Sequence, residues 1–192
     1  MLICTCTLTG TSPISFSRAY EVDKLERESD DKYRDRTWRN HTHRDQNGEA
    51  YIPPTALKNA LSAVAKYMGE KIKGKGQMTY TKKFQAGIAV SDPIMLGIKA
   101  DDIPPEKLFL PSDGVAGSGK RVWKIYPTLP SWEAKATIYI LDEIISPEKL
   151  NDYLVRAGQF IGFGRYRPER NGFYGRFTVS HFKSVSEKGV AA

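Results

Sequence analysis

The feature that most restricts the fold of this chain is a well-marked helix placed between two predicted strands. Residues 133–141 alternate between apolar and polar side chains, which predicts a half-buried strand. A helix should then begin after Ser146, a good N-cap, with Pro147 at its first position and Gly158 as its C-terminal cap. A last strand is predicted over residues 173–182. The second half of the chain therefore has the order strand, helix, strand.

The first half of the chain has a similar order. Residues 2–9 predict a strand, and residues 54–69 predict a helix, because their apolar side chains recur at helical spacing up to Gly69. Two extended segments are expected at residues 78–90 and 94–98. The remaining expected segments are a short extended piece at 14–18, a proline-rich loop at 100–111 and a strand at 121–126.

This order predicts an α+β chain with a modified ferredoxin-like, or RRM-like, fold. Both helices should cover one face of an antiparallel sheet and leave the other face free. RNA-recognition modules of this topology bind single strands on the free face. With 192 residues, the chain is long enough for a single domain, residues 1–192, that carries insertions.

Two insertions and a tail are expected to decorate the domain. Fifteen of the 27 residues from 21 to 47 are charged, eight acidic and seven basic, and aliphatic residues are almost absent. Residues 20–48 are therefore interpreted as a charged, flexible insertion that buries no core of its own. Residues 112–132 are interpreted as an inserted hairpin, and residues 184–192 as a frayed tail.

The loop at residues 158–177 carries the strongest functional pattern, because glycines, arginines and aromatic residues are interleaved in it. Glycine allows positive φ or close approach, arginine suits phosphate, and aromatic rings stack on bases. The alternative is a long surface loop with turn glycines and solvated arginines. The residues in question are Gly162, Gly164, Gly172, Gly175, Arg165, Arg167, Arg170, Arg176, Tyr166 and Tyr174.

Gly114 to Lys120 has the glycine and lysine spacing of a phosphate-binding P-loop, but Arg121 stands where Ser or Thr should ligate magnesium. A strand is also predicted where the motif needs a helix. A hairpin tip that grips a nucleic-acid backbone fits better. Its residues would be Lys120, Arg121 and Lys124, beside Trp123.

The charged insertion contains His41 and His43, which could bind a metal or act as a general base in RNA cleavage, or could simply be exposed loop histidines. Asp30, Asp31 and Asp35 could likewise be catalytic carboxylates or surface charge. No local pattern selects one of these residues, so no catalytic residue, metal or cofactor is predicted.

The charge and hydropathy of the chain indicate which classes of partner to expect. The net charge is +7 and the pI about 9.3, which favours nucleic acid or another anionic partner. No apolar run approaches the roughly 20 residues of a membrane span, so no membrane partner is expected. The only two cysteines, Cys4 and Cys6, read as buried side chains in a reducing, cytoplasmic compartment.

The helix start Tyr-Ile-Pro-Pro-Thr-Ala-Leu-Lys-Asn-Ala-Leu at residues 51–61 resembles the Ile-Pro-Gly-Ser-Ser-Leu-Lys-Gly-Ala-Leu string of RAMP proteins from CRISPR systems, notably the Cas7 group. The glycine-rich loop resembles that family's loop between the second helix and the last strand. Pro54-Thr55 departs from the family's Gly-Ser. The chain is also shorter than many members.

The resemblance implies an RRM-like subunit that polymerises along a guide RNA. In that family the glycine-rich loop and a basic residue of the first helix, here Lys58, face the RNA backbone. The hairpin at 120–124 would then be a thumb that interrupts base pairing, and the insertion at 20–48 would be finger-like.

The resulting hypothesis is a non-catalytic protein that binds single-stranded nucleic acid, RNA favoured over DNA, beside copies of itself and other CRISPR effector subunits. The alternatives are a Cas6-like metal-independent endoribonuclease with His41 or His43 as base, and a protein of a virus or mobile element that binds single-stranded DNA or interferes with a CRISPR complex. The predicted contact residues are Arg18, Lys58, Lys120, Arg121, Trp123, Lys124, Gly162, Gly164, Arg165, Tyr166, Arg167, Arg170, Tyr174 and Arg176.

Overall fold

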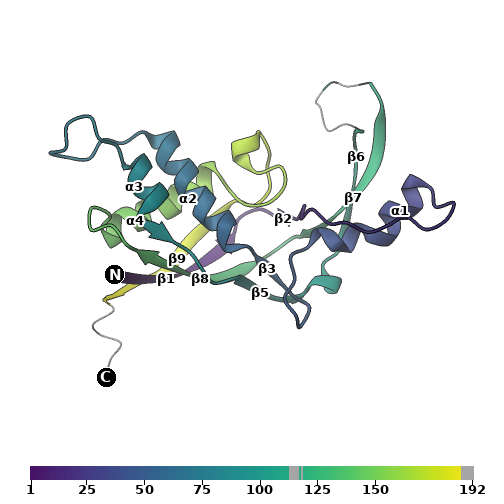
Figure 1. The fold of residues 1–192 in the computed structure, drawn as a ribbon, viewed down its shortest axis with the longest axis horizontal. Coiled ribbons are helices and arrows are strands. Elements are labelled where there is room, and N and C mark those ends of the chain that lie inside the picture. The colour runs from purple at the N-terminus through teal and green to yellow at the C-terminus, as the bar shows by residue number, and fades with distance from the viewer. Residues whose placement is uncertain (113–116, 118, 187–192) are drawn as a thin grey trace.

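A computed structural model describes residues 1–112, 117 and 119–186 of the chain (Figure 1). The helices are α1 (Asp30–Thr37), α2 (Pro54–Met68), α3 (Tyr80–Ala86) and α4 (Pro147–Phe160), with the 3-10 turns η1 (Trp38–His41), η2 (Ala100–Asp102) and η3 (Pro168–Arg170). The strands are β1 (Leu2–Gly10), β2 (Ile14–Ser15), β3 (Glu49–Ile52), β4 (Ile88–Ala89), β5 (Ile94–Lys99), β6 (Pro105–Pro111), β7 (Arg121–Leu129), β8 (Glu133–Ile140) and β9 (Phe177–Ser186).

The central sheet has the strand order β4-β8-β1-β9, and every neighbouring pair in it is antiparallel. Along the chain these strands alternate with α2 and α4 as β1-α2-β4 and β8-α4-β9, which is the ferredoxin-like arrangement. Figure 1 shows α2, α3 and α4 gathered on one side of the sheet. The predicted α+β, RRM-like fold is therefore confirmed.

Helix α4 begins where the sequence predicts it. The Ser146 side chain accepts a hydrogen bond from the Lys149 backbone N–H at 3.2 Å, and Pro147 follows as the first helical residue. The helix does not end at Gly158, however, but continues to Phe160. A Cβ on Gly158 would lie 2.1 Å from the Phe177 carbonyl oxygen. Gly158 is thus needed for the close approach of α4 to β9 and not as a cap.

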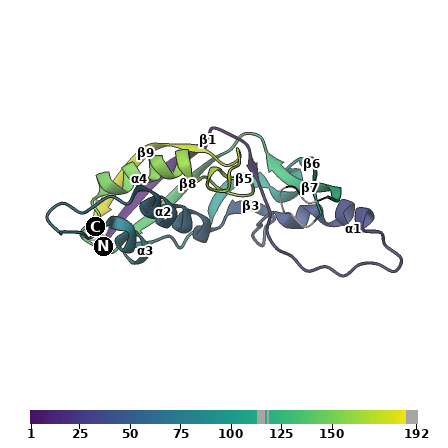
Figure 2. The same ribbon diagram turned by 90° about the horizontal axis from the view of Figure 1, so that it is seen from above.

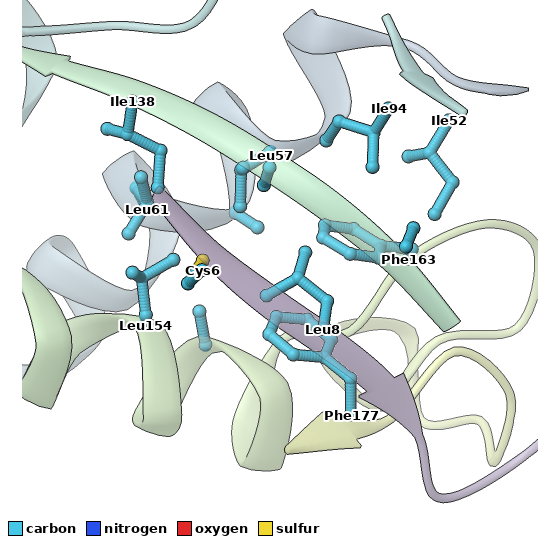
Figure 3. Packing of buried hydrophobic residues seen from close by; sticks show 14 of the residues in the cluster. Cys6, Leu8, Ile52, Leu57, Leu61, Ile94, Ile138, Leu154, Phe163 and Phe177 are labelled. Atoms are coloured by element: carbon cyan, nitrogen blue, oxygen red, sulfur yellow. The ribbon is translucent and has the colours of Figure 1, made fainter. Parts of the chain in front are cut away.

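The core lies between the sheet and these helices (Figure 3). Cys6 and Leu8 of β1 are buried on the side of the sheet that faces the helices, and Leu57 of α2 is buried in the same core. Phe163 and Phe177 stack with ring centroids 4.7 Å apart, so the start of the glycine-rich loop is anchored in the same core as the last strand.

Two long connections, residues 11–53 and 90–132, meet at the other end of the molecule and carry a second lobe; each is longer than the insertion expected within it. The segment between β1 and α2 carries β2, α1 and β3, and the segment between β4 and β8 carries β5, β6 and β7. Strand β2 pairs with β7 and β3 pairs with β5, so the insertions are joined by backbone hydrogen bonds. Figure 2 shows α1 and the β6–β7 hairpin at this end, away from α2–α4.

Two local predictions are wrong. Residues 80–86 form α3 and not a strand, because Phe84 points fully into the core and Tyr80 packs with it against Tyr153 at helical spacing. Residues 105–111 were expected to be a loop, but they form the strand β6, which pairs with β7 over seven residues. Its two prolines stand at its ends, where an edge strand tolerates them.

The charged insertion also contains regular structure. Helix α1 begins after the N-cap Ser29 and carries Asp30 and Asp31 in its first turn, where the helix dipole favours acids. Asp30 pairs with Lys24 and Asp31 with Arg34. Buried Trp38 follows at the start of η1. Asp30 and Asp31 are thus ion-paired residues in the first turn of α1, and Asp35 lies later on the same helix.

The ends of β9 also differ from the expected strand, because it starts at Phe177 and runs through Ser186. The tail predicted from residue 184 therefore falls partly on this strand, and partly on residues 187–192, which lie outside the described residues. Among the described helices, none has the length and apolar character that crossing a bilayer requires.

Candidate nucleic-acid interface

The glycine-rich loop is fixed by backbone hydrogen bonds to the segment that joins β1 and β2. The Arg165 N–H donates to the Ser15 carbonyl at 2.8 Å, and the Gly175 N–H donates to the Pro13 carbonyl at 2.7 Å. In the other direction, the Thr11 N–H donates to the Arg176 carbonyl at 2.9 Å. A loop held in this way presents its side chains on a rigid frame.

Gly164 shows why this frame requires glycine. Its φ is +73°, and a Cβ would lie 2.4 Å from the Ser15 carbonyl oxygen. Gly164 therefore serves the fold of the loop itself, because both its positive φ and the nearby Ser15 carbonyl exclude a side chain.

A groove lies between this loop and the N-terminus of α2. It consists of two adjoining hollows, of about 310 and 190 Å³, that share Ala56, Phe163, Gly164 and Arg167 in their walls. The first hollow adds Thr55 and Asn59 from α2 and Gly162 and Glu169 from the loop, and the second adds Arg18, His43 and Pro53.

The groove is basic, with one acid. Arg18 is exposed, and its backbone is held by η1: its N–H donates to the His41 carbonyl at 2.8 Å. Arg167 donates through Nε and Nη2 to Glu169 at 2.9 and 2.6 Å, and through Nη1 to the Gly164 carbonyl at 3.4 Å. The N-terminus of α2 adds the positive end of its dipole. An anion in the groove would thus meet two arginines and a helix N-terminus.

The two neighbouring histidines have different environments. His41 makes a 3.0 Å hydrogen bond between Nδ1 and the Arg18 carbonyl and packs between the rings of Tyr20 and Tyr126. His43 lines the groove beside Arg18. Burial lowers the pKa of both imidazoles below the ordinary 6.5, and nearby arginines act in the same direction. Both rings are therefore neutral at neutral pH.

Arg165 points away from the groove into an aromatic stack. Its guanidinium lies 3.8 Å from the centroid of Tyr126 and 4.6 Å from that of Tyr166, and Nη2 donates to the Tyr166 hydroxyl at 3.1 Å. Its Nε is buried without a hydrogen-bond partner. The stack joins the loop to β7 and η1, so Arg165 links the two lobes.

The other predicted loop residues point in several directions. Tyr174 donates to Glu106 of β6 at 2.7 Å, and burial with this hydrogen bond raises the pKa of its hydroxyl to about 12. The Arg176 guanidinium is bonded to the Gln159 carbonyl at the end of α4. Arg170 is exposed at the end of η3.

Lys58 is occupied by a structural role. Its Nζ donates to the carbonyls of Phe84 and Gln85, at 2.6 and 2.9 Å, and so caps the C-terminus of α3. Burial lowers the pKa of this ammonium. The contact that the resemblance implied for Lys58 stays a prediction, and the groove as described does not include it.

The hairpin residues lie in the second lobe, away from the groove (Figure 1). Phe109 and Trp123 pair across the strands with ring centroids 5.2 Å apart, and they are 49% and 58% exposed. The Arg121 guanidinium lies 5.5 Å from the Phe109 centroid. Lys120 is exposed, and Lys124 donates to the Ser112 carbonyl at 3.1 Å. This surface suits base stacking beside basic groups.

The structure thus brings together Arg18, Gly162, Gly164 and Arg167, and it places the hairpin residues apart from them. Sequence reasoning missed Thr55 and Asn59, although their place in the first turns of a helix that opens with Pro53-Pro54 was a usable signal.

Within residues 1–112, 117 and 119–186, no group of three His, Cys, Asp or Glu side chains is placed to hold a metal. The P-loop-like segment lies partly outside the described residues.

No family model and no curated protein matches the chain. Among solved structures, this chain is similar to a protein chain in the cryo-EM structure of the type III-B Cmr-beta bound to cognate target RNA. The TM-score is 0.59 at 12% identity, over 96% of this chain and 61% of that one. This chain therefore spans about three fifths of the length of that match.

Cmr6 from Pyrococcus furiosus is also similar, with a TM-score of 0.47 at 13% identity, over 94% of this chain and 99% of that one. The likeness to the Cmr-beta chain covers nearly all of the described fold. This chain therefore shares the fold of that Cmr-beta chain. The resemblance that the two sequence motifs carry is confirmed at the level of the fold.

Proposed function

We propose that the chain binds the sugar-phosphate backbone of single-stranded RNA in the groove between α2 and the glycine-rich loop. The observation that carries the proposal is the placement of Arg18 and Arg167 in the wall of one hollow, which adjoins a second, glycine-lined hollow at the N-terminus of α2. Guanidinium groups and helix N-termini are the usual partners of phosphate.

The rigidity of the site supports binding of a backbone rather than reading of bases. The groove walls are the first turns of α2 and a loop fixed by backbone hydrogen bonds, and the charged side chains in them are those of Arg18, Arg167 and Glu169. Guanidinium groups on such a frame suit phosphate. Contact to phosphates alone would hold any sequence.

The likeness of the fold supports a proposal on the partners. The similar Cmr-beta chain belongs to a complex with target RNA. We infer that this chain also works beside other subunits of a CRISPR effector and beside copies of itself, with the hairpin surface of Phe109 and Trp123 in contact with bases.

The test is a salt titration of binding to single-stranded oligouridylate and the matching oligodeoxyuridylate. With two phosphates neutralised by Arg18 and Arg167, log Kd should change with log salt with a slope of at least about 1.4, because each contact contributes about 0.7 on single strands. RNA should bind more tightly than DNA. A flat salt response, or no binding at low salt, would refute the proposal.

A second candidate function is metal-independent RNA cleavage, and the position of His43 is what favours it. Its neutral imidazole could take the proton of a ribose 2′-hydroxyl, whose oxygen would attack the phosphorus while the bond to the 5′-oxygen breaks and that oxygen takes a proton from solvent water. Arg18 and Arg167 would stabilise the charge that develops on the phosphate.

Incubation of RNA in EDTA with wild-type protein and with His43→Asn separates the two functions. A cyclic 2′,3′-phosphate product that His43→Asn abolishes would establish cleavage. Intact RNA in both reactions would exclude it and leave the binding function in place.

A further inference from the structure

Part of the open face of the central sheet carries rows of hydroxyl groups, and the row of Ile3, Tyr139 and Val185 lies beside them. On β1, Cys4, Cys6 and Leu8 are buried against the helices, so the intervening threonines face the other way. The pairing aligns their neighbours: Thr5 lies between Thr137 and Lys183, Thr7 between Lys135 and Ser180, and Thr9 between Glu133 and Thr178. We call the face made by Thr5, Thr7, Thr9, Thr137, Thr178 and Ser180 the hydroxyl face.

Part of this face is hollowed and basic. A hollow of about 650 Å³ is lined by Thr5, Thr7 and Thr137, with Lys135, Lys183 and His181 around it. Within the described part of the chain, neither lysine forms an ion pair, and the three threonine hydroxyls make no hydrogen bond. The one acid at the rim, Glu133, accepts a hydrogen bond from Thr9 at 3.1 Å. The polar groups without a partner in this hollow are therefore cations and hydroxyls, of which Thr5 is exposed and Thr7 is 9% exposed.

His181 occupies a strained position at the edge of the hollow. The register between β1 and β9 shifts between Thr5 and Thr7, which is a β-bulge, and His181 in this bulge has φ +50°. A non-glycine residue in the left-handed region costs free energy, and such residues concentrate at binding sites. The bulge turns an extra imidazole toward the hollow without breaking the sheet.

We infer that the hydroxyl face binds the phosphodiester backbone of a nucleic-acid strand as a second site, distinct from the groove. The charge of the face is complementary to phosphate, and its hydroxyl donors repeat about every 6.8 Å along β1 and about 4.8 Å between strands. A ligand with regularly spaced anionic oxygens fits such a grid.

Recognition on this face would differ from that of RNA-recognition modules. Those modules stack bases on aromatic rings of their central strands. Here the outward-facing aromatic residue of β8, Tyr139, donates to Asp92 at the edge of the sheet. The hydroxyl face therefore provides phosphate contacts without a stacking platform. It lies on the opposite side of the sheet from α2 and α4, so a strand in the groove leaves it free.

The test compares three double variants that each remove two positive charges. Lys135→Gln with Lys183→Gln alters the hydroxyl face, Arg18→Gln with Arg167→Gln alters the groove, and Lys66→Gln with Lys82→Gln is a matched control on exposed positions of α2 and α3. Each is titrated with oligouridylate by fluorescence anisotropy over a range of salt. 4-Thiouridine cross-links are mapped by mass spectrometry.

We expect the Lys135/Lys183 variant to bind at least fivefold more weakly than the control and to lose about 1.4 from its salt slope. Cross-links in wild type should map to residues 2–10 and 177–186. Unchanged affinity together with no cross-link on these strands would overturn the inference, as would capture of an acidic protein by this face with no effect on RNA. If only the Arg18/Arg167 variant loses binding, RNA binds in the proposed groove and not on the hydroxyl face. If only the Lys135/Lys183 variant loses binding, RNA binds on the hydroxyl face and not in the groove.

Discussion

Glu169 is the residue that limits the charge of the groove. Its carboxylate holds Arg167 through two hydrogen bonds and would repel a phosphate in the same hollow. Glu169→Gln should therefore raise RNA affinity about fivefold, since removal of one nearby like charge is worth roughly 1 kcal/mol. Anisotropy with oligouridylate measures the change. Glu143→Gln, an exposed acid just before α4, is the control, and an equal gain there would contradict a local effect.

His41 makes folding depend on pH. Because burial lowers the pKa of His41 below 6.5, the unfolded chain takes up a proton at a higher pH than the folded chain. The stabilising contribution is complete above pH 6.5 and is lost as the pH falls through the lowered folded-state pKa. His41→Asn retains a donor for the Arg18 carbonyl and removes this titration.

The drop in Tm between pH 7.5 and pH 5.5 should accordingly be smaller for His41→Asn than for wild type. His43 has a pKa lowered in the same direction, so the double variant with His43→Asn should be less sensitive to pH still. An unchanged drop in Tm in the double variant would show that these histidines do not titrate as described.

The strained backbone of His181 allows stability and binding to be separated. His181→Gly should stabilise the fold by about 1 kcal/mol, because glycine accepts φ +50° without the Cβ penalty. It should weaken RNA binding at the hydroxyl face. Thermal melts measure stability and anisotropy measures RNA affinity. A variant with higher stability and higher RNA affinity would contradict a binding role for the imidazole.

At the scale of elements, the glycine-rich loop is a structural frame before it is a contact surface. Gly164 and Gly74 have φ values of +73° and +76°, but only at Gly164 would a Cβ meet backbone, since nothing lies within 4 Å of a Cβ at Gly74. Gly164→Ala should thus cost about 1–3 kcal/mol more than Gly74→Ala. Urea titration gives both values, and equal costs would mean that the contact with Ser15 is not tight.

The elements that sequence predicted well are those whose signals are local. Helices α2 and α4 carry apolar stripes and terminal prolines, and β1 and β8 alternate. Helix α3 and strand β6 were misassigned because tertiary contacts decide them. Phe84 packs on Tyr153, with centroids 4.4 Å apart, and β6 exists only through its pairing with β7.

The same reason limits prediction of the site. Glycine and arginine content singled out the loop at residues 158–177, and the helix start at residues 51–61 was recognised. That Arg167 faces the groove while Arg165 enters an aromatic stack depends on the packing of Tyr126, which comes from a distant strand. The hydroxyl face was visible as alternating threonines in β1, but its basic rim comes from β8 and β9.

At the scale of the whole molecule, the groove owes its position to the joining of two insertions to one RRM-like core. Ile14 pairs with Leu129 and Ser15 with Thr128, and the Ser15 and Thr128 hydroxyls are hydrogen-bonded at 3.1 Å. These contacts link segments more than a hundred residues apart. They place the β1–β2 connection under the glycine-rich loop, and Arg18 beside Arg167.

The central claim is that Arg18 and Arg167 hold RNA phosphates in this groove. The most direct measurement is the salt dependence of oligouridylate binding by the Arg18→Gln/Arg167→Gln variant, compared with the Lys66→Gln/Lys82→Gln control. The groove variant should bind at least tenfold more weakly at low salt, with a log–log slope lower by about 1.4, while the control stays close to wild type. Equal affinities and equal slopes for the two variants would contradict the account.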